Sequence, residues 1–453
     1  MKKYDLIVIG GGTSGVSLAH RAGAHNWQVA LVEKSKLGGT CINVGCIPSK
    51  TLIGSAKVLH MIRDSGQYGI HTGEASADWP AIVKRKDELV ARIRNRSYKN
   101  IEGKTNITLY EGEAVFDSPH RVRVNDDILS AERIVIAAGA RTAIPPLTGL
   151  DKVSYLTSTS VMELEQLPDS LLIVGGGIIA LEFSQLLSRL GVEVTIIQRD
   201  QRLAPNLDPD ISEEIRRILE TENVGVITGF NVKEVGRSAK GVYVSGEGAT
   251  GTESISGSSL LVATGRMPNS DRLNLAAAGI DTDQRGYVKV DNNFKTSGEG
   301  VWAVGDITGG MMFTHKAWHD SLLLSRYLMN NEKIEPGKRA IPFAIYTEPE
   351  IAGVGINETT ASASGLNVKV YKYPFAYQGR ARAIGKIDGF VKLIANKEDG
   401  IILGAHIIGP EAGELIHELI TAIYFKATIN DLRDIIHVHP TLSEAILNSA
   451  WSR

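Results

Sequence analysis

Residues 5–15 read Asp-Leu-Ile-Val-Ile-Gly-Gly-Gly-Thr-Ser-Gly, and this stretch decides the fold. The apolar run predicts a short buried strand, and the small residues of 16–24 predict a helix directly after the glycines. In such a strand–turn–helix unit the glycines let the backbone approach a pyrophosphate, which the positive end of the helix attracts. The alternative is a glycine-rich turn with a purely structural role.

A second strand, predicted over 28–32, ends in Glu33 a little over 20 residues later. At that spacing a carboxylate can accept a hydrogen bond from a ribose 2′-hydroxyl. The complete strand–turn–helix–strand–acid pattern therefore predicts a dinucleotide site formed by Gly10, Gly12, Gly15 and Glu33.

The same pattern returns at residues 171–180, which read Leu-Leu-Ile-Val-Gly-Gly-Gly-Ile-Ile-Ala. A helix over 181–190 and a strand over 193–197 are predicted to follow. Two such units in one chain imply two dinucleotides. The second would be bound at Gly175, Gly177 and Ala180.

The second unit differs from the first at the end of its second strand, which reads Gln198-Arg199 and has no acid. A carboxylate there would repel a 2′-phosphate, whereas an arginine would pair with it. Arg199 therefore favours NADPH over NADH. The alternative is that Arg199 only lines a solvated surface.

Three further apolar runs end in Gly139, in Gly265 and in the pair Gly305-Asp306. We expect these strand ends to lie beneath the two nucleotides. Asp306 is the one charged residue of its run and could accept a hydrogen bond from a ribitol or ribose hydroxyl. Its alternative role is that of a helix cap.

The composition limits the possible partners. The chain has 453 residues, enough for about three domains, with 43% hydrophobic and 22% charged residues, as in ordinary globular proteins. The 49 basic and 51 acidic side chains give a net charge of −2, so nucleic acid is not an expected partner. No apolar run approaches the roughly 20 residues of a membrane span, and the first residues lack a signal-peptide core. We expect a cytoplasmic protein without a membrane partner.

The only two cysteines lie in residues 38–50, Gly-Gly-Thr-Cys-Ile-Asn-Val-Gly-Cys-Ile-Pro-Ser-Lys. On a regular helix Cys41 and Cys46 would have Cα atoms roughly 8–9 Å apart, beyond the reach of a disulfide. A bridge therefore needs a distorted backbone, which Asn43 and Gly45 permit. So short a loop would stabilise the fold little, which favours a redox role. Two unrelated thiols, or half of a zinc site, are the alternatives, although a second cysteine pair is absent.

Residues 38–50, the two glycine patterns and the His-Pro-Thr-Leu-Ser-Glu stretch at 439–444 together resemble the flavoprotein disulfide reductases. This is the family of dihydrolipoamide dehydrogenase, glutathione reductase and mercuric reductase, and the resemblance covers essentially the whole chain. It implies an α/β protein with two Rossmann-like domains, one for FAD and one for NAD(P), and a C-terminal α+β dimerisation domain that makes a homodimer. The implied domains are 1–150 completed by 270–335 for FAD, 151–269 for NAD(P), and 336–453 for dimerisation.

The resemblance also assigns roles to residues. It implies that Cys46 lies against the flavin, that Cys41 exchanges with the substrate, and that Lys50 pairs with Glu182 beside the flavin. FAD would be bound by Gly10, Gly12, Gly15, Glu33 and Asp306, and the nicotinamide nucleotide by Gly175, Gly177, Ala180 and Arg199.

His439 and Glu444 match the acid–base pair that family members supply across the dimer interface. A histidine suits this task because its imidazole takes up and releases protons near neutral pH, and a carboxylate behind it would orient the ring. The same segment also fits a helix capping box, with Thr441 as cap and Glu444 at the third helical position. Both roles can coexist.

The expected reaction is electron transfer between NAD(P)H and a small disulfide or dithiol through the cysteine pair. Ile178 and residues 313–317 resemble the lipoamide branch, whereas 409–416 resembles mercuric reductase. The alternative is therefore an NADPH-dependent reductase of a metal ion or a quinone-type acceptor, although the chain has no further cysteines for a metal shuttle. A catalytically silent FAD-binding partner is the third reading. His315 and His319 have the spacing of a metal-binding helix but lack an obvious third ligand, so no metal site is predicted.

Overall fold

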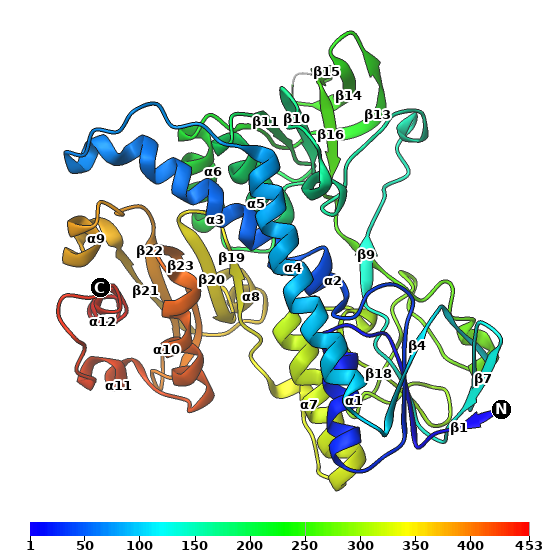
Figure 1. The fold of residues 1–453 in the computed structure, drawn as a ribbon. Helices are drawn as coiled ribbons and strands as arrows, with labels where there is room; N and C mark the ends of the chain where they lie inside the picture. The colour runs from blue at the N-terminus through cyan, green and yellow to red at the C-terminus, as the bar shows by residue number, and fades with distance from the viewer. Residues whose placement is uncertain (250, 453) are drawn as a thin grey trace.

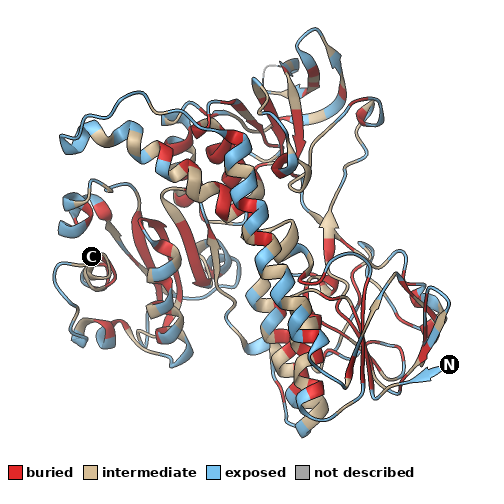
Figure 2. Cartoon of the chain, viewed as in Figure 1, coloured by how far each residue is buried: buried red, intermediate tan, exposed pale blue. Residues whose placement is uncertain are grey.

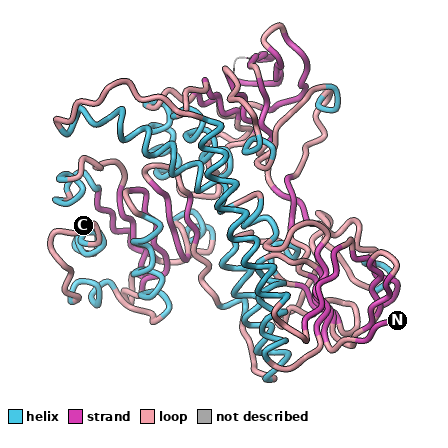
Figure 3. The backbone as a smooth tube through the Cα atoms, viewed as in Figure 1, coloured by secondary structure: helices cyan, strands magenta, loops and turns pink. Residues whose placement is uncertain are grey.

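The computed structural model describes residues 1–249 and 251–452. Figure 1 shows three lobes, with the N-terminus in the first and the C-terminus in the third. Strands gather in each lobe while long helices run between the lobes (Figure 3). The α/β class expected from the sequence is confirmed.

The first lobe is built on a parallel sheet in the order β18 (Val301–Ala303), β8 (Ile134–Ile136), β2 (Leu6–Ile9), β3 (Val29–Glu33) and β4 (Ile107–Glu111). Because side chains alternate along a strand, β2 serves two cores. Leu6 and Val8 pack toward α1 (Thr13–Ala24), α4 (Trp79–Glu102) and α7 (Thr314–Asn330). Ile7 and Ile9 pack toward a small sheet of β1 (Lys2–Lys3), β7 (Asp127–Ser130), β6 (Arg121–Val124) and β5 (Ala114–Ser118).

The second lobe repeats this plan. Its parallel sheet has the order β12 (Gly225–Ile227), β11 (Glu193–Ile197), β10 (Ser170–Val174) and β16 (Ser259–Val262). Leu171 and Ile173 of β10 pack with α5 (Ile178–Arg189) and α6 (Pro209–Thr221). Leu172 and Val174 face the antiparallel strands β13 (Asn231–Ser238), β14 (Gly241–Gly248) and β15 (Gly251–Gly257). The two lobes are therefore variations of one βαβ design, as the internal repeat predicts.

The third lobe is an antiparallel sheet in the order β19 (Phe343–Ile345), β20 (Glu350–Gly355), β23 (Ile402–Gly409), β22 (Phe390–Asn396) and β21 (Val368–Pro374). Its helices are α8 (Glu358–Ala363), α9 (Gly379–Ala383), α10 (Ala412–Tyr424), α11 (Ile429–Asp434) and α12 (Glu444–Trp451). Figure 2 shows buried residues along the central strands of all three lobes, so each has its own core.

Two adjacent segments connect the first and second lobes. The chain leaves the first lobe through β9 (Ala140–Thr142) and returns through β17 (Arg266–Pro268), and these strands pair antiparallel. Short 3₁₀ turns complete the connections: η1 (Asp64–Tyr68), η2 (Leu150–Lys152), η3 (Ser160–Glu163), η4 (Leu275–Ala278), η5 (Gly305–Thr308), η6 (Pro336–Lys338) and η7 (Phe375–Tyr377). No helix in 1–249 or 251–452 has the length and apolar character needed to span a membrane.

A buried ion cluster joins the second and third lobes. Lys392 of β22 has no exposed side-chain surface, and its ammonium contacts Asp208, Asp210 and Glu358 at 2.7–2.8 Å. Burial opposes ionisation of Asp208, but the hydrogen bond from Lys392 holds the pKa of this carboxyl below its usual value. The cluster fixes the start of α6 to the third sheet.

Candidate active site

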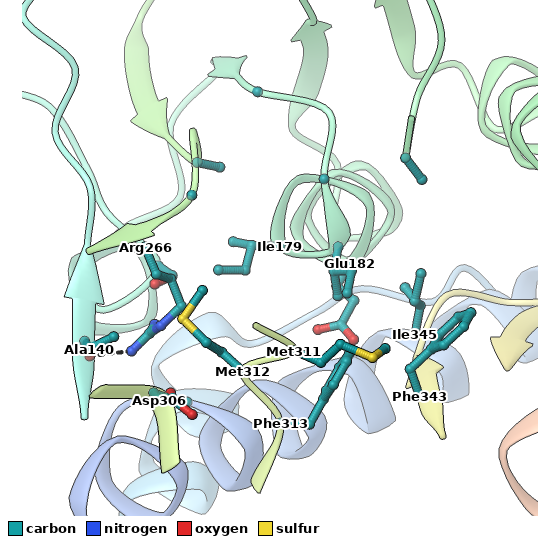
Figure 4. Close-up of a pocket in the computed structure, with 18 of the residues that line it drawn as sticks. Ala140, Ile179, Glu182, Arg266, Asp306, Met311, Met312, Phe313, Phe343 and Ile345 are labelled. Atoms are coloured by element: carbon teal, nitrogen blue, oxygen red, sulfur yellow. Dashed lines mark hydrogen bonds between the residues drawn. The ribbon is translucent and has the colours of Figure 1, made fainter. Parts of the chain in front are cut away.

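A cleft of about 1890 Å³ runs between the lobes and collects most of the residues singled out in the sequence. Figure 4 shows part of its lining, with Asp306 and Arg266 at one end and Glu182, Phe343 and Ile345 at the other. The predicted site residues that line it are Gly12, Cys41, Cys46, Lys50, Gly139, Gly175, Gly177, Glu182, Arg199, Gly265 and Asp306.

The two glycine turns have the same geometry. Gly10 and Gly175 have φ of +113° and +115°, values that side chains rarely allow. A Cβ at Gly10 would lie 2.3 Å from the Ala137 carbonyl oxygen, and one at Gly175 would lie 2.4 Å from that of Ala263. Each turn is therefore pressed against the end of the neighbouring strand. A side chain at either position would displace the backbone that must face a pyrophosphate.

The cleft has room for dinucleotides at these turns. A Cβ at Gly177, Gly139 or Gly265 would meet nothing within 4 Å, so these positions leave space open in the cleft, although the positive φ at Gly139 and Gly265 also disfavours a side chain. Glu33 and Gly10 line a second cavity of about 230 Å³ beside the first turn. The Glu33 carboxylate accepts hydrogen bonds from the Gly11 and Ser35 amides at 2.7 and 2.8 Å, which hold it at the end of β3. The open glycine faces and this fixed acid fit a dinucleotide in the first lobe.

Two predicted residues lie behind the turns. Gly15 is in α1, where a Cβ would lie 1.8 Å from the Gly10 carbonyl oxygen, so its role is close packing of helix on turn. Ala180, the corresponding residue of α5, is fully buried. Both residues allow the helix N-terminus to approach the cleft without lining it.

Asp306 lines the cleft from the turn η5, which follows β18. Among the described residues no side chain or amide donates a hydrogen bond to this carboxylate. Burial raises the pKa of the Asp306 carboxyl, while the Arg266 and Lys316 charges oppose the shift. This largely buried Asp306 carboxylate suits a hydroxyl donor, such as the ribitol predicted from the sequence. The Arg266 guanidinium donates to the Ala140 carbonyl, and its Nε is buried without a partner in the part of the chain that is described.

Arg199 lies at the mouth of the cleft beyond β11. Its side chain is exposed, and it forms no ion pair with any described residue. The guanidinium is therefore free to meet an anionic group on a nucleotide bound at α5.

The cysteine pair occupies a break between two helices. Cys41 belongs to α2 (Gly39–Asn43) and Cys46 begins α3 (Cys46–Arg63), so the two are not on one regular helix. The Asn43 amide pins the break by donating to the Leu37 and Gly39 carbonyls, both at 3.0 Å. The backbone distortion expected between the cysteines is present, and the two sulfurs lie within hydrogen-bond reach as free thiols.

The pKa values of the two thiols are shifted in opposite directions. The hydrogen bond from Cys41, the Thr314 hydroxyl 3.4 Å away and the Lys50 charge lower the pKa of Cys46 to about 6, although burial opposes them. The interaction with Cys46 and burial raise the pKa of Cys41. At neutral pH the reduced pair is therefore a Cys46 thiolate beside a protonated Cys41, and the thiolate is the form that reacts.

Lys50 and Glu182 form an ion pair where the three lobes meet. The Lys50 ammonium contacts both Glu182 oxygens, at 2.7 and 3.0 Å, and the Glu182 side chain is only 5% exposed. Tyr346, directly after β19, donates its backbone N–H to Glu182 at 3.0 Å. The pair predicted from the sequence is therefore formed, and the third lobe takes part in holding it.

His439 and Glu444 form their predicted contact on the third lobe. His439 Nδ1 lies 2.9 Å from Glu444 Oε1, and the His439 side chain is 80% exposed. Within this chain no described contact links His439 to either cysteine. The capping box is only half formed: Glu444 accepts from the Thr441 N–H at 2.8 Å, but α12 begins at Glu444 itself, so placing Glu444 at the third helical position was wrong. The Thr441 hydroxyl donates instead to the Val438 carbonyl.

The histidines and carboxylates that could bind a metal ion contact other groups of the protein instead. His315 Nε2 lies 2.6 Å from the Pro342 carbonyl, and His319 Nδ1 lies 2.8 Å from an Arg339 nitrogen. The one group of three candidate ligands in 1–249 and 251–452 is Asp208, Asp210 and Glu358, and the Lys392 ammonium already lies among them.

Thr314, Arg266 and Tyr346 contribute to the cleft but were not singled out in the sequence. Thr314 lies in the 313–317 stretch that resembles the lipoamide branch, and it is the first residue of α7. That resemblance was the available signal for its position in the site. Tyr346 lies almost 300 residues from Lys50 in the chain, so only the folded structure brings them together.

Comparisons with known proteins agree with this geometry. The family model described as pyridine nucleotide-disulphide oxidoreductase matches residues 4–321, and the model for the dimerisation domain of the same family matches 341–450. A mercuric reductase from Lysinibacillus sphaericus is 35% identical over 447 residues, which are 98% of this chain and 81% of that protein. A dihydrolipoyl dehydrogenase from Bacillus subtilis is 35% identical over 464 residues, covering 99% and 97% of the two chains.

Among solved structures, the Cu(II) complex of the HOCl-induced flavoprotein disulfide reductase RclA from Escherichia coli is similar over the whole chain. Its TM-score is 0.90 at 30% sequence identity, with 100% of this chain and 99% of that chain covered.

Proposed function

This chain belongs to the pyridine nucleotide-disulphide oxidoreductases, and from that membership we propose that Cys41 and Cys46 carry electrons between NADPH and a small disulfide or dithiol. As a member of the family it is an enzyme that uses FAD and a pyridine nucleotide. The observation that carries the proposal is the pair of hydrogen-bonded thiols with opposite pKa shifts in the cleft onto which both glycine turns open.

FAD, when bound, supplies the exchange of an electron pair between a nicotinamide hydride and a disulfide. In our proposal Gly10, Gly12 and Gly15 form its pyrophosphate turn, Glu33 binds the ribose and Asp306 accepts from the ribitol. Gly139 lies at a strand end beneath it. The close packing at Gly10 and Gly15, the open faces of Gly12 and Gly139, and the Asp306 carboxylate, to which no described residue donates a hydrogen bond, support these roles. The Lys50–Glu182 ion pair would hold a fixed positive charge beside the flavin and near Cys46.

The thiols would act in sequence. The Cys41 sulfur, once deprotonated, attacks a substrate disulfide, forming a mixed disulfide and releasing the first substrate thiol. The Cys46 thiolate then attacks the Cys41 sulfur, releases the second thiol and leaves the Cys41–Cys46 disulfide. The low pKa of Cys46, about 6, keeps the second nucleophile ionised at neutral pH.

Cys41 needs a base because its pKa is raised, and no described histidine or carboxylate contacts it in this chain. We propose that His439 of the partner subunit in a homodimer removes this proton and returns it to the leaving thiol, with Glu444 orienting the ring at 2.9 Å. The dimerisation-domain match over 341–450 supports this arrangement.

The nucleotide turn of the second lobe would bind NADPH. Gly175, Gly177 and Ala180 form the turn, Gly265 lies at a neighbouring strand end, and Arg199 meets the 2′-phosphate. The exposed Arg199 guanidinium at the cleft, which pairs with no acid among the described residues, supports NADPH over NADH. The boundaries 1–150 with 270–335, 151–269 and 336–453, and a cytoplasmic location, stay part of the proposal.

Reduction of a soft metal ion is the second candidate. Two relatives are named for mercury and for a Cu(II) complex, and the sulfurs of Met311 and Met312 line the same cleft as the cysteines. Thiolate and thioether groups suit soft ions. In this alternative the ion is the substrate and is captured by the thiol pair.

One turnover panel tests both candidates. The holoenzyme is given NADPH or NADH with lipoamide, glutathione disulfide, Hg(II), Cu(II) or a quinone, and nucleotide oxidation is followed. We expect a small disulfide to be the best acceptor and Cys41→Ser to abolish its turnover while FAD stays bound. A fully active Cys41→Ser enzyme would refute the thiol relay.

A further inference from the structure

Tyr346 reaches the Lys50–Glu182 pair from the third lobe and contacts both of its members. Its backbone N–H donates to Glu182 Oε1 at 3.0 Å. The Lys50 Nζ lies over its ring, 4.9 Å from the centroid. One residue therefore orders the carboxylate through its backbone and covers the ammonium with its side chain.

The contact with the ring matters because Lys50 is not fully enclosed by protein. Its side chain is 32% exposed, whereas that of Glu182 is 5% exposed. An aromatic face attracts a cation and excludes water from it. Without the ring, the ammonium would be free to turn toward water and weaken its field inside the cleft.

Resting on the function proposed above, we propose that Tyr346 is a positioning residue that holds the Lys50 ammonium against Glu182 and thereby keeps its charge directed at the Cys46 sulfur. The backbone contribution is the same for any residue at this position. The ring contribution depends on an aromatic side chain.

Burial and the charges of Glu350, Glu182, Glu414 and Cys46 raise the pKa of the Tyr346 phenol. The phenol therefore remains neutral throughout the titration range of Cys46. Cys46 and Lys50 lie one turn apart on α3 and both line the cleft. Cys41, Thr314, Lys50 and Glu182 act on Cys46, and the Lys50 charge lowers its pKa. A change at Tyr346 is thus expected to reach Cys46 through Lys50.

The test measures ionisation of Cys46 in the holoenzyme of a Cys41→Ser parent, in which Cys46 is the only thiol of the chain. Thiolate absorbance in the ultraviolet is followed against pH for the parent, Tyr346→Phe, Tyr346→Leu and Lys50→Met. We expect the Phe chain to titrate like the parent. In the Leu chain the acid dissociation constant of Cys46 should fall about two- to fivefold, the size of a partly exposed cation–aromatic contact, and it should fall at least as far in Lys50→Met.

A double variant separates positioning from general structural damage. Tyr346→Leu combined with Lys50→Met should titrate like Lys50→Met alone, because the ring has no cation left to hold. Additive shifts, or a Phe chain that shifts as far as the Leu chain, would overturn the proposal. If the Leu chain does not fold, Tyr346→Met takes its place in the same comparison. Disulfide turnover by the wild-type enzyme tests the proposed function separately, so the two failures are distinguishable.

Discussion

Replacing Thr314 with valine removes one hydroxyl beside Cys46 and keeps the shape of the side chain. The Thr314 Oγ1 lies 3.4 Å from the Cys46 sulfur, and toward a thiolate only the hydroxyl can donate. Thr314 is the first residue of α7, and the N-cap position of this helix belongs to Phe313. The substitution should therefore change the ionisation of Cys46 and leave the helix intact.

The expected shift follows from the contact. A hydrogen bond to a charged group contributes about 1.5–3 kcal/mol, and the lower end suits a long contact that is one of several stabilising the thiolate. About 1.5 kcal/mol corresponds to about one pKa unit, so the pKa of Cys46 should rise from about 6 toward about 7. Near pH ~6.5 the ionised fraction would then fall about threefold, from roughly three quarters to one quarter, while well above both values it would be unchanged.

The assay is the thiolate titration in the Cys41→Ser parent, with Thr314→Ser as the matched control that keeps a hydroxyl. The midpoint of this parent is the reference for each shift, because the substitution changes the Cys41 hydrogen bond that lowers the pKa of Cys46. We expect the midpoint of the valine chain to rise by about one pH unit and that of the serine chain to stay near the parent. An unmoved midpoint in the valine chain, or an equal rise in the serine chain, would refute the assignment of the hydroxyl as a donor to the thiolate.

Three further predictions concern other parts of the molecule. Arg199→Glu should raise the KM for NADPH much more than that for NADH in steady-state assays, and equal effects would remove the 2′-phosphate assignment. Cys41→Ser and His439→Gln chains, each inactive alone, should regain about a quarter of wild-type disulfide turnover when co-expressed in equal amounts, because about half of the dimers are mixed and each mixed dimer restores one of its two sites; no recovery would contradict a base supplied by the partner. Lys392→Met should lower the free energy of unfolding by about 3–5 kcal/mol in denaturant titrations, since it leaves the buried Asp208 carboxylate without its cation, whereas the exposed Lys397→Met should change it little; similar small losses at both positions would sink this estimate.

The local parts of the site follow from sequence because local chemistry dictates them. The turns at Gly10 and Gly175 can be predicted from sequence because only glycine tolerates their backbone geometry beside a neighbouring carbonyl. The helix break between Cys41 and Cys46 can be predicted because an unbroken helix would hold the two cysteines too far apart for a disulfide.

The parts that sequence reasoning missed depend on contacts between distant segments. The Thr314 hydroxyl meets Cys46 across 268 residues, and no spacing rule relates the two. Tyr346 follows an ordinary edge strand, and nothing in its neighbours reveals that Lys50 lies under its ring. The capping box failed for a different reason. The Glu444 side chain accepts from the Thr441 N–H as expected, but the Thr441 hydroxyl donates to the Val438 carbonyl and α12 begins only at Glu444.

Because β9 and β17 pair with each other, the chain enters and leaves the second lobe at neighbouring positions. The ends of this lobe emerge side by side, joined by the hydrogen bond from the Ala143 amide to the Gly265 carbonyl at 2.9 Å, so the lobe is inserted in the chain at a single point. A segment with neighbouring ends can be exchanged for one from a relative, carrying its own coenzyme preference, without rerouting the rest of the chain. The exchanged segment would need an acid at position 208, because Lys392 of the third lobe would otherwise lose one of its counter-ions where the two lobes meet.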